Sequence, residues 1–379
     1  MRQAKSKSLL CVLVAAFCLL ASSAFAGPVW EFGDEGQGLL KLDYKGQFQL
    51  VNQDSGDNDS LEFNFRRNRI ALMGAYGENF GLYVQTEYTE DNNYNSTDGD
   101  NFQLLDAVLR FKFNNSLNLW MGKFKYNFTR ENLEACEMPL TLDRSGLIRA
   151  PFVSTRDKGI AVWGNLANDM VQYRVDAMNG NDSEVDSNLR YSARVHVSLL
   201  DPEKGYGYKG TYMGQKKVLT FGAAYQMESD VAYSDSVSGD AVDYSAWTVD
   251  GFFEYPLEGM GAVTLSAAYV DYDLDDAYQG ANPSAGATGL TGEKNGGYVK
   301  AGYMLPSMPL QFFGRSESWS FADLYGVMDH EVELLGLGLN YYVRGQNLKV
   351  TVEYTNCDYD SNSTVEDADT VVAQVQVIF

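Results

Sequence analysis

Apolar and polar residues alternate along most of the chain, and the alternation is clearest at its end. In "VVAQVQVIF" (371–379) the valines and Phe379 share one face of an extended strand, while Gln374 and Gln376 lie on the other. An apolar face that continues to the last residue is typical of a wall strand with lipid on one side and water on the other. A strand packed between two sheets is the alternative that this segment leaves open.

The same alternation recurs in about sixteen segments that are bounded by turn residues. Clear examples are 39–50, 117–126, 171–178, 188–199, 261–272 and 348–356. Ordinary globular strands average about five or six residues, whereas a tilted strand needs about 9 to 11 to cross a bilayer. No helical period is sustained. The pattern therefore predicts an all-β chain that forms a transmembrane antiparallel β-barrel of about 16 strands.

The connections between these segments alternate in length, which indicates two unlike rims. Short joins of three or four residues lie at 77–79, 114–116, 167–169, 258–260, 306–309 and 344–346, and long acidic ones at 90–100 and 230–243. Outer-membrane barrels have short periplasmic turns and long outer loops in this alternation. The segment "DPEKGYGYKGTYMGQKK" (201–217) is long but falls on the short side, and so breaks the rule.

The first residues indicate export. Basic residues at positions 2, 5 and 7 precede an apolar run over 9–20, and "AFA" (24–26) supplies small residues before a cleavage point. We therefore expect a cleaved signal peptide over 1–26 and a barrel over 27–379. No later stretch approaches the ~20 consecutive apolar residues of a membrane helix. Only Cys136 and Cys357 remain after cleavage, which excludes a disulfide framework but leaves one bridge open.

The chain is acidic, with a formal net charge of -22, and the charge is unevenly distributed. Residues 27–217 hold 21 Lys and Arg against 27 Asp and Glu, whereas residues 218–379 hold 5 against 24. Nucleic acid is an unlikely partner for so acidic a protein. The positive charge lies mostly in the first half.

A stretch in that half resembles a known family. "FNFRRNRIALMGAYGENFGLYVQTEY" (63–88) and "LLDAVLRFKFNNSLNLWMGKFKYNFTRENL" (104–133) are similar to strands of the phosphate-selective porin O and P family, and "TLDRSGLIRAP" (141–151) and "RDKGIAVWGNLAND" (156–169) continue the likeness. The resemblance implies a sixteen-stranded porin of the bacterial outer membrane. It also implies a homotrimer, inward-folded loops and a ladder of arginines for anions.

The alternation places a stripe of basic residues on the water-facing side of neighbouring strands. A charge facing lipid near mid-bilayer would cost about 2 to 4 kcal/mol, so the inward side is favoured. In the segment 117–126 this assignment makes Phe124 and Tyr126 point outward. The stripe comprises Arg67, Arg69, Arg110, Lys112, Lys123, Lys125, Arg174, Arg190 and Arg194. It could form a track for anions, or its cations could pair with acidic residues of inner loops.

Residues 128–155 form the longest connection of the first half, and we expect them to fold into the lumen as a constriction loop. Its charged members are Arg130, Glu131, Glu134, Glu137, Asp143, Arg144 and Arg149. The two signs nearly balance, which is unlike a strongly cationic ring. Phosphate specificity is therefore not supported by this segment alone.

These patterns favour a porin for passive diffusion of small hydrophilic solutes and ions, with a preference for anions such as phosphate. A general or cation-preferring pore and a plugged structural or adhesive barrel are the alternatives. Expected partners are small anions or other solutes, lipopolysaccharide and membrane lipid, and the outer-membrane assembly machinery, which would read Phe379.

Enzyme chemistry has little support in the sequence. The only histidines, His196 and His330, have no paired His or clustered Cys near them. The acidic stretch 270–278 lacks the Gly and the closing Glu of an EF-hand. We therefore expect no catalytic residue, no metal site and no cofactor.

Overall fold

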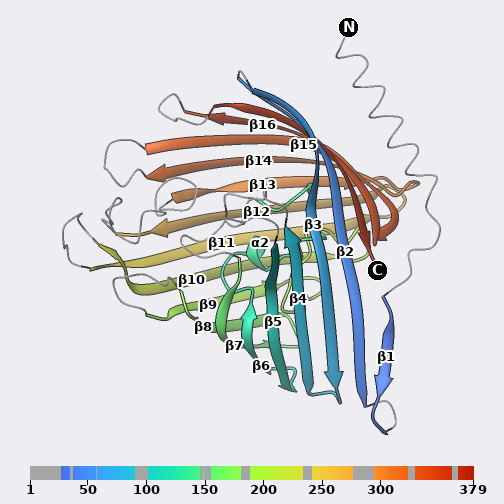
Figure 1. Cartoon of the computed structure of the whole chain (residues 1–379), viewed down its shortest axis with the longest axis vertical. Coiled ribbons are helices and arrows are strands. Elements are labelled where there is room, and N and C mark those ends of the chain that lie inside the picture. The colour runs from blue at the N-terminus through green and yellow to red at the C-terminus, as the bar shows by residue number, and fades with distance from the viewer. Residues whose placement is uncertain are drawn as a thin grey trace.

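The computed structural model describes residues 27–34, 37–56, 58–89, 101–145, 148, 155–180, 188–233, 241–275, 294–322, 329–360 and 366–379. These residues form one antiparallel sheet that closes on itself into a barrel (Figure 1). Among them, no helix is long and apolar enough to cross a membrane. The predicted signal peptide lies outside the described residues.

Sixteen strands, β2 to β17, make the wall, as predicted, and a short strand β1 is added to it. Their bounds are β1 Val29–Phe32, β2 Gly38–Ser55, β3 Asn58–Tyr76, β4 Phe80–Thr89, β5 Asn101–Asn114, β6 Leu117–Phe124, β7 Asp157–Leu166, β8 Val171–Met178, β9 Arg190–Ser198, β10 Val218–Tyr233, β11 Ala241–Leu257, β12 Gly261–Asp273, β13 Lys294–Met304, β14 Leu310–Ala322, β15 Asp329–Gln346, β16 Leu348–Tyr359 and β17 Ala368–Ile378. Each strand pairs with the next in sequence, so the six short joins predicted from the sequence lie together at one rim.

The seam of the barrel places Phe379 beside strand β2. Strand β17 pairs with β2 from Asp369 opposite Asp54 to Ile378 opposite Lys45. The backbone of Phe379 then exchanges two hydrogen bonds with Tyr44, at 2.6 and 3.0 Å, and the two rings lie 5.3 Å apart. Beyond that point β1 continues the ladder along β2, which leaves less of the β2 edge unpaired in the apolar layer.

The predicted faces are confirmed at the seam. Gln374 and Gln376 are 1% and 0% exposed inside the barrel, whereas the Phe379 side lies outward and is 43% exposed. Gln47 and Gln49 on β2 donate amide hydrogen bonds to these two glutamines at 2.7 and 2.8 Å. A ladder of paired amides therefore lines the inner side of the seam, and the apolar side chains face outward.

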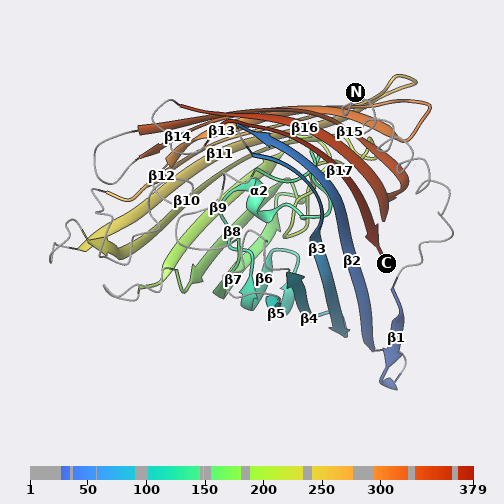
Figure 2. The same ribbon diagram turned by 45° about the horizontal axis from the view of Figure 1, so that its top comes forward.

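The inside of the barrel is not the uniform water column that the alternation implied. Two segments fold into it: the described part of the inner loop (residues 125–145, 148, 155 and 156, between β6 and β7) and the inner turn, residues 199–217 between β9 and β10. The inner loop carries the single turn of helix α2, Arg130–Leu133, which Figure 2 shows inside the ring of strands. The inner turn enters the barrel from the rim of short joins. Because it folds into the lumen, this connection is long on a rim where the other connections are short.

The two segments hold each other through backbone and side-chain contacts. The Tyr208 amide donates to the Leu133 carbonyl at 3.2 Å, and the Ala135 amide donates to the Tyr208 carbonyl at 2.9 Å. Helix α2 also places Arg130 against Glu203 of the inner turn, with both guanidinium nitrogens 2.8 Å from the carboxylate oxygens. Together they form a plug, and apolar side chains of the facing wall pack against it.

Candidate functional site

A β-bulge in β3 brings three arginines to the lumen. The register between β2 and β3 shifts between Gln47 and Phe48, which pair with Arg67 and Phe65, so Arg66 is the extra residue. Strict alternation placed only Arg67 and Arg69 inward. With the bulge, Arg66 also points to the inner loop.

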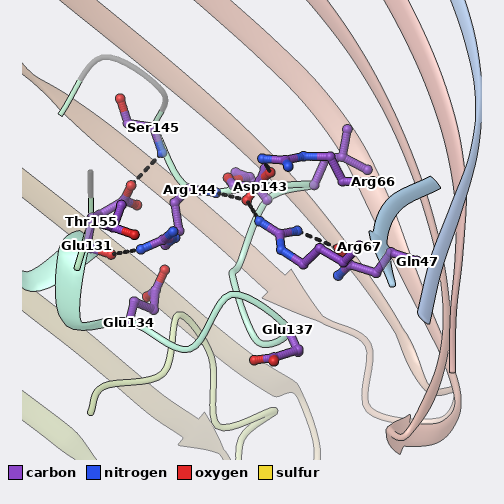
Figure 3. Close-up of polar contacts among 12 residues, drawn as sticks. Gln47, Arg66, Arg67, Glu131, Glu134, Glu137, Asp143, Arg144, Ser145 and Thr155 are labelled. Carbon is purple, nitrogen blue, oxygen red and sulfur yellow. Dashed lines mark hydrogen bonds and ion pairs between the residues drawn. The ribbon is translucent and has the colours of Figure 1, made fainter. Parts of the chain in front are cut away.

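The carboxylate of Asp143 in the inner loop forms ion pairs with two of these arginines. Its carboxylate lies 2.5 Å from Arg66 and 2.7 Å from Arg67, and its other contacts include the Arg144 amide at 2.9 Å (Figure 3). Arg67 also donates to the side-chain oxygen of Gln47. The inner loop is therefore anchored to the β2–β3 wall by charge-assisted hydrogen bonds, which are stronger than neutral ones.

Further contacts tie the inner loop across the barrel to the opposite wall. Lys300 of β13 pairs with Glu131 at 2.5 Å, the Leu142 amide donates to Glu353 of β16 at 2.7 Å, and Asn340 of β15 donates to the Leu140 carbonyl at 2.7 Å. Arg144 donates to the carbonyls of helix α2 at 3.0 and 3.1 Å. The inner loop thus spans the lumen from the β2–β3 wall to strands β13, β15 and β16.

Two adjoining cavities, which together are called the passage, lie between the plug and strands β2–β7. One has a volume of about 430 Å³ and the other, toward the rim of short joins, about 350 Å³. The two cavities share Arg110, Trp120 and Trp163. The aromatic side of the larger one is formed by Tyr83, Trp120, Phe124, Trp163 and Tyr206.

Positive charge outnumbers negative charge in the larger cavity. Its lining includes the cations Lys45, Arg69, Arg110, Lys125 and Arg156 and the carboxylates of Asp106 and Glu137. Three of the cations are paired: Lys45 with Glu137 at 2.8 Å, Arg69 with Glu87 at 2.6 Å and Arg156 with Asp106 at 2.9 Å. Arg110 and Lys125 have no carboxylate partner among the described residues.

The remaining stripe residues lie on the inner face but away from this passage. Arg190 pairs with Glu228 at 2.6 Å and Arg194 with Asp250 at 2.6 Å, with all four side chains buried. Arg174 bonds to Gln172 at 2.6 Å and to the inner turn. Acidic residues of β10 and β11 thus neutralise Arg190 and Arg194, in place of the inner-loop carboxylates that the alternative interpretation expected, so the stripe is not one continuous track.

The prediction for Lys123 was wrong. Asn118, Trp120 and Phe124 are the inward residues of β6, and Lys123 lies on the outward face, where its amine donates to the Leu104 carbonyl at 2.9 Å. Phe124 and Tyr126, predicted to face outward, are each 1% exposed inside. The rule that apolar residues face lipid fails here because the lumen is filled with protein.

Beside the passage, burial and nearby cations shift the pKa values of two side chains of the inner loop. Burial, followed by the Arg144 guanidinium, lowers the pKa of the Lys125 amine to about 7. Burial raises the pKa of the Cys136 thiol, but Arg144 and Lys125 outweigh it and hold that pKa well below its usual value. Both shifts favour the less positive form, as nearby cations require. Glu134 behaves differently, because burial and then Glu131 raise its pKa to about 8, and it does not line the cavity.

Several passage residues were not predicted, although the signal for some was present. Lys45 lines the larger cavity and alternates with apolar neighbours on β2 as clearly as the residues of the stripe do, and Asp106 shares a face with Arg110 and Lys112. Trp163 and Tyr206 had no such signal, since they gain their role from the plug. Arg149 lies outside the described residues.

The structure brings together no second kind of chemistry in its described part. There, no group of three or more potential metal ligands is found. Cys136 and Cys357 are both free. His196 lies 2.6 Å from the Tyr208 hydroxyl, and Ser198 contacts Thr220 at 3.3 Å.

Known proteins resemble this chain over most of its length. A family model for "Phosphate-selective porin O and P" matches residues 37–379. The chain is 22% identical over 379 residues to an uncharacterized protein of Aquifex aeolicus (strain VF5), covering 90% of this chain and 86% of that protein.

Two solved structures share the fold at low identity. An anion-selective porin from Comamonas acidovorans has a TM-score of 0.60 at 10% identity and covers 90% of this chain and 100% of its own. The trimer form of OmpT, an outer membrane protein of Vibrio cholerae, has a TM-score of 0.55 at 13% identity. The match covers 90% of this chain and 99% of the OmpT chain.

Proposed function

Because the chain belongs to the phosphate-selective porin O and P family, it is a channel of the bacterial outer membrane, and we propose that it conducts small anions passively along strands β2–β7. The observation that carries this proposal is the charge of the passage. Its carboxylates are paired with cations, while Arg110 and Lys125 have no carboxylate partner among the described residues. A net positive constriction lowers the barrier for anions and raises it for cations.

A reversal potential in a KCl gradient across a planar bilayer tests the proposal. We expect chloride to permeate better than potassium. A potential of the opposite sign would leave the channel assignment intact and reject the anion preference. Phosphate added to one side should reduce the chloride current if the passage binds it, and absence of that block would reject phosphate as a preferred solute.

The acidic composition favours a cation-preferring pore as the second candidate. Acidic residues of the β8–β16 wall are paired with arginines of the same wall, however: Glu228 with Arg190, Asp250 with Arg194 and Glu353 with Arg315. The sign of the reversal potential separates the two candidates. A barrel that the plug fully closed would pass no stable current.

The anion preference is expected to depend on pH. Lys125 is charged below its pKa of about 7 and neutral above it, and Glu134 becomes negative above about 8. Both changes remove positive charge as the pH rises, so the chloride preference should fall about twofold or more between about pH 6 and pH 9. Reversal potentials at the two pH values measure this.

The Lys125→Met variant is the matched control for that experiment. It should show a weak chloride preference at both pH values and lose most of the change. A wild-type preference that is constant over the same interval would contradict the role of Lys125.

We also propose the processing and assembly of the chain. Residues 1–26 would be removed as a signal peptide, and the inner loop, around 128–155, would be the constriction. The trimer form of OmpT supports a homotrimer, which gel mobility before and after boiling would test. Phe379 at the seam is the residue that the assembly machinery would read, and the outward acidic residues Asp273 and Asp275 suit cation bridges to lipopolysaccharide.

A further inference from the structure

Arg110 lies where the two cavities adjoin, so a solute that moves from one cavity to the other must pass it. It lines both cavities together with Trp120 and Trp163. The larger volume, about 430 Å³, lies in the range of about 300 to 1,000 Å³ that is usual for small-molecule sites. The junction is therefore large enough for an organic solute.

The guanidinium of Arg110 is held by aromatic rings instead of by acids. Its central carbon lies 5.0 Å from the Tyr83 ring centroid and 4.4 Å from that of Trp120. Trp120 in turn stacks on Tyr206 of the inner turn, with centroids 3.9 Å apart. The Arg110 Nε is buried without a hydrogen-bond partner. The charge is thus kept available in surroundings that are poorer in water than an open pore.

A second unpaired donor lies on the same side of the cavity. The Trp163 Nε1 is buried and has no acceptor, and the Trp163 ring meets Trp120 edge to face at 6.0 Å. Buried indole N–H groups usually find a partner. An acceptor on a passing solute would satisfy this one.

The other arginines that lie over aromatic rings do not share this property. Arg130 and Arg194 also lie over Tyr208, at 4.5 and 5.3 Å, but each has a buried carboxylate partner. Arg174 lies over the same ring and has no carboxylate partner in the described part of the chain either, but its guanidinium bonds to Gln172 and to the Gly205 carbonyl. Among these arginines, Arg110 is the one that lines the two cavities and has no carboxylate partner among the described residues.

We propose that this junction is a binding site for small organic anions that carry one carboxylate on a flat ring, such as benzoate. Arg110 would meet the carboxylate, and the ring edges of Trp120 and Trp163, which line both cavities, would contact the ring of the ligand. Phosphate fits less well, because a strongly hydrated dianion needs several donors to replace its water. The inference rests on the proposed function, since the passage must conduct anions for the site to be reached.

Block of the single-channel chloride current measures the site. We expect benzoate to reduce the current at a concentration about tenfold lower than acetate, which lacks the ring, and lower than phosphate. Calorimetric titration of the detergent-solubilised protein with benzoate gives the same ranking without reconstitution. Equal potency of benzoate and acetate, or stronger block by phosphate, would overturn the proposal while the channel function stood.

Two variants separate the ring from the charge. Trp120→Leu should remove most of the difference in blocking potency between benzoate and acetate. Arg110→Gln should weaken both carboxylates about tenfold. Lys209→Gln, which removes an exposed lysine of the inner turn outside both cavities, is the charge-matched control and should behave as wild type.

The outcomes of the variant experiment are distinguishable. If benzoate still blocked the current of Trp120→Leu at a lower concentration than acetate by the wild-type factor, the proposed contact between Trp120 and the ligand's ring would be rejected. A wild-type protein that passes no chloride current would reject the proposed function, and the benzoate site with it.

Discussion

Replacing Glu203 by Ala is expected to open the barrel. Arg130 is 0% exposed, and its guanidinium makes two bonds of 2.8 Å to the Glu203 carboxylate, which is the strongest link between the inner loop and the inner turn. Removing one partner of a buried pair costs about 3 to 5 kcal/mol because the other charge is left uncompensated. The inner loop and the inner turn should therefore separate. Single-channel conductance should rise several-fold and become noisy.

The double variant Arg130→Met, Glu203→Leu is the control for this prediction. It removes both charges and keeps apolar contacts with Tyr208 and Phe252, over which the Arg130 guanidinium lies at 4.5 and 4.1 Å. Replacing a buried pair by apolar residues is often neutral. The double variant should conduct like wild type. Unchanged conductance in Glu203→Ala would show that the pair does not hold the plug.

Replacing Glu137 by Gln is expected to increase the anion preference strongly. Burial would raise the pKa of Glu137, but Lys45 and Arg69 hold it well below its usual value, so the residue is charged at neutral pH. Its carboxylate neutralises Lys45 at 2.8 Å within the passage. Loss of one negative charge at about 5 Å changes the energy of a passing ion by about 0.8 kcal/mol even in water, which is about fourfold for each ion. Because the anion and the cation shift in opposite directions, their permeability ratio should change by about 16-fold.

Reversal potentials of Glu137→Gln and of Glu258→Gln test this directly. Glu258 is exposed in a short turn between β11 and β12, so its removal changes the net charge equally without affecting the passage. Gln at 137 keeps the size and one acceptor, which preserves the loop. A similar shift in both variants would show that the overall charge sets selectivity, and the local pair would lose its assigned role.

Much of the wall could be predicted from the sequence because one physical rule governs it. A residue such as Val375 faces lipid and its neighbour Gln376 faces inward, since a strand alternates its side chains and hydrocarbon excludes polar groups. The rule placed Arg67, Arg110, Arg174 and Arg194 on the inner face. It failed at Phe124, where the inner face is covered by protein and not by water, and so Lys123 was assigned to the wrong side.

The sequence by itself determined the number of strands, the two unlike rims, the closing of the last strand on the first and most of the inward cations, because these follow from local alternation and turn length. Only the tertiary structure decided which cations remain unpaired. Arg194 meets Asp250 and Arg130 meets Glu203 across 56 and 73 residues of sequence, whereas Arg110 meets aromatic rings. The Arg130–Glu203 pair and the rings around Arg110 depend on how two segments fold into the barrel, and that packing has no periodic signature in the chain.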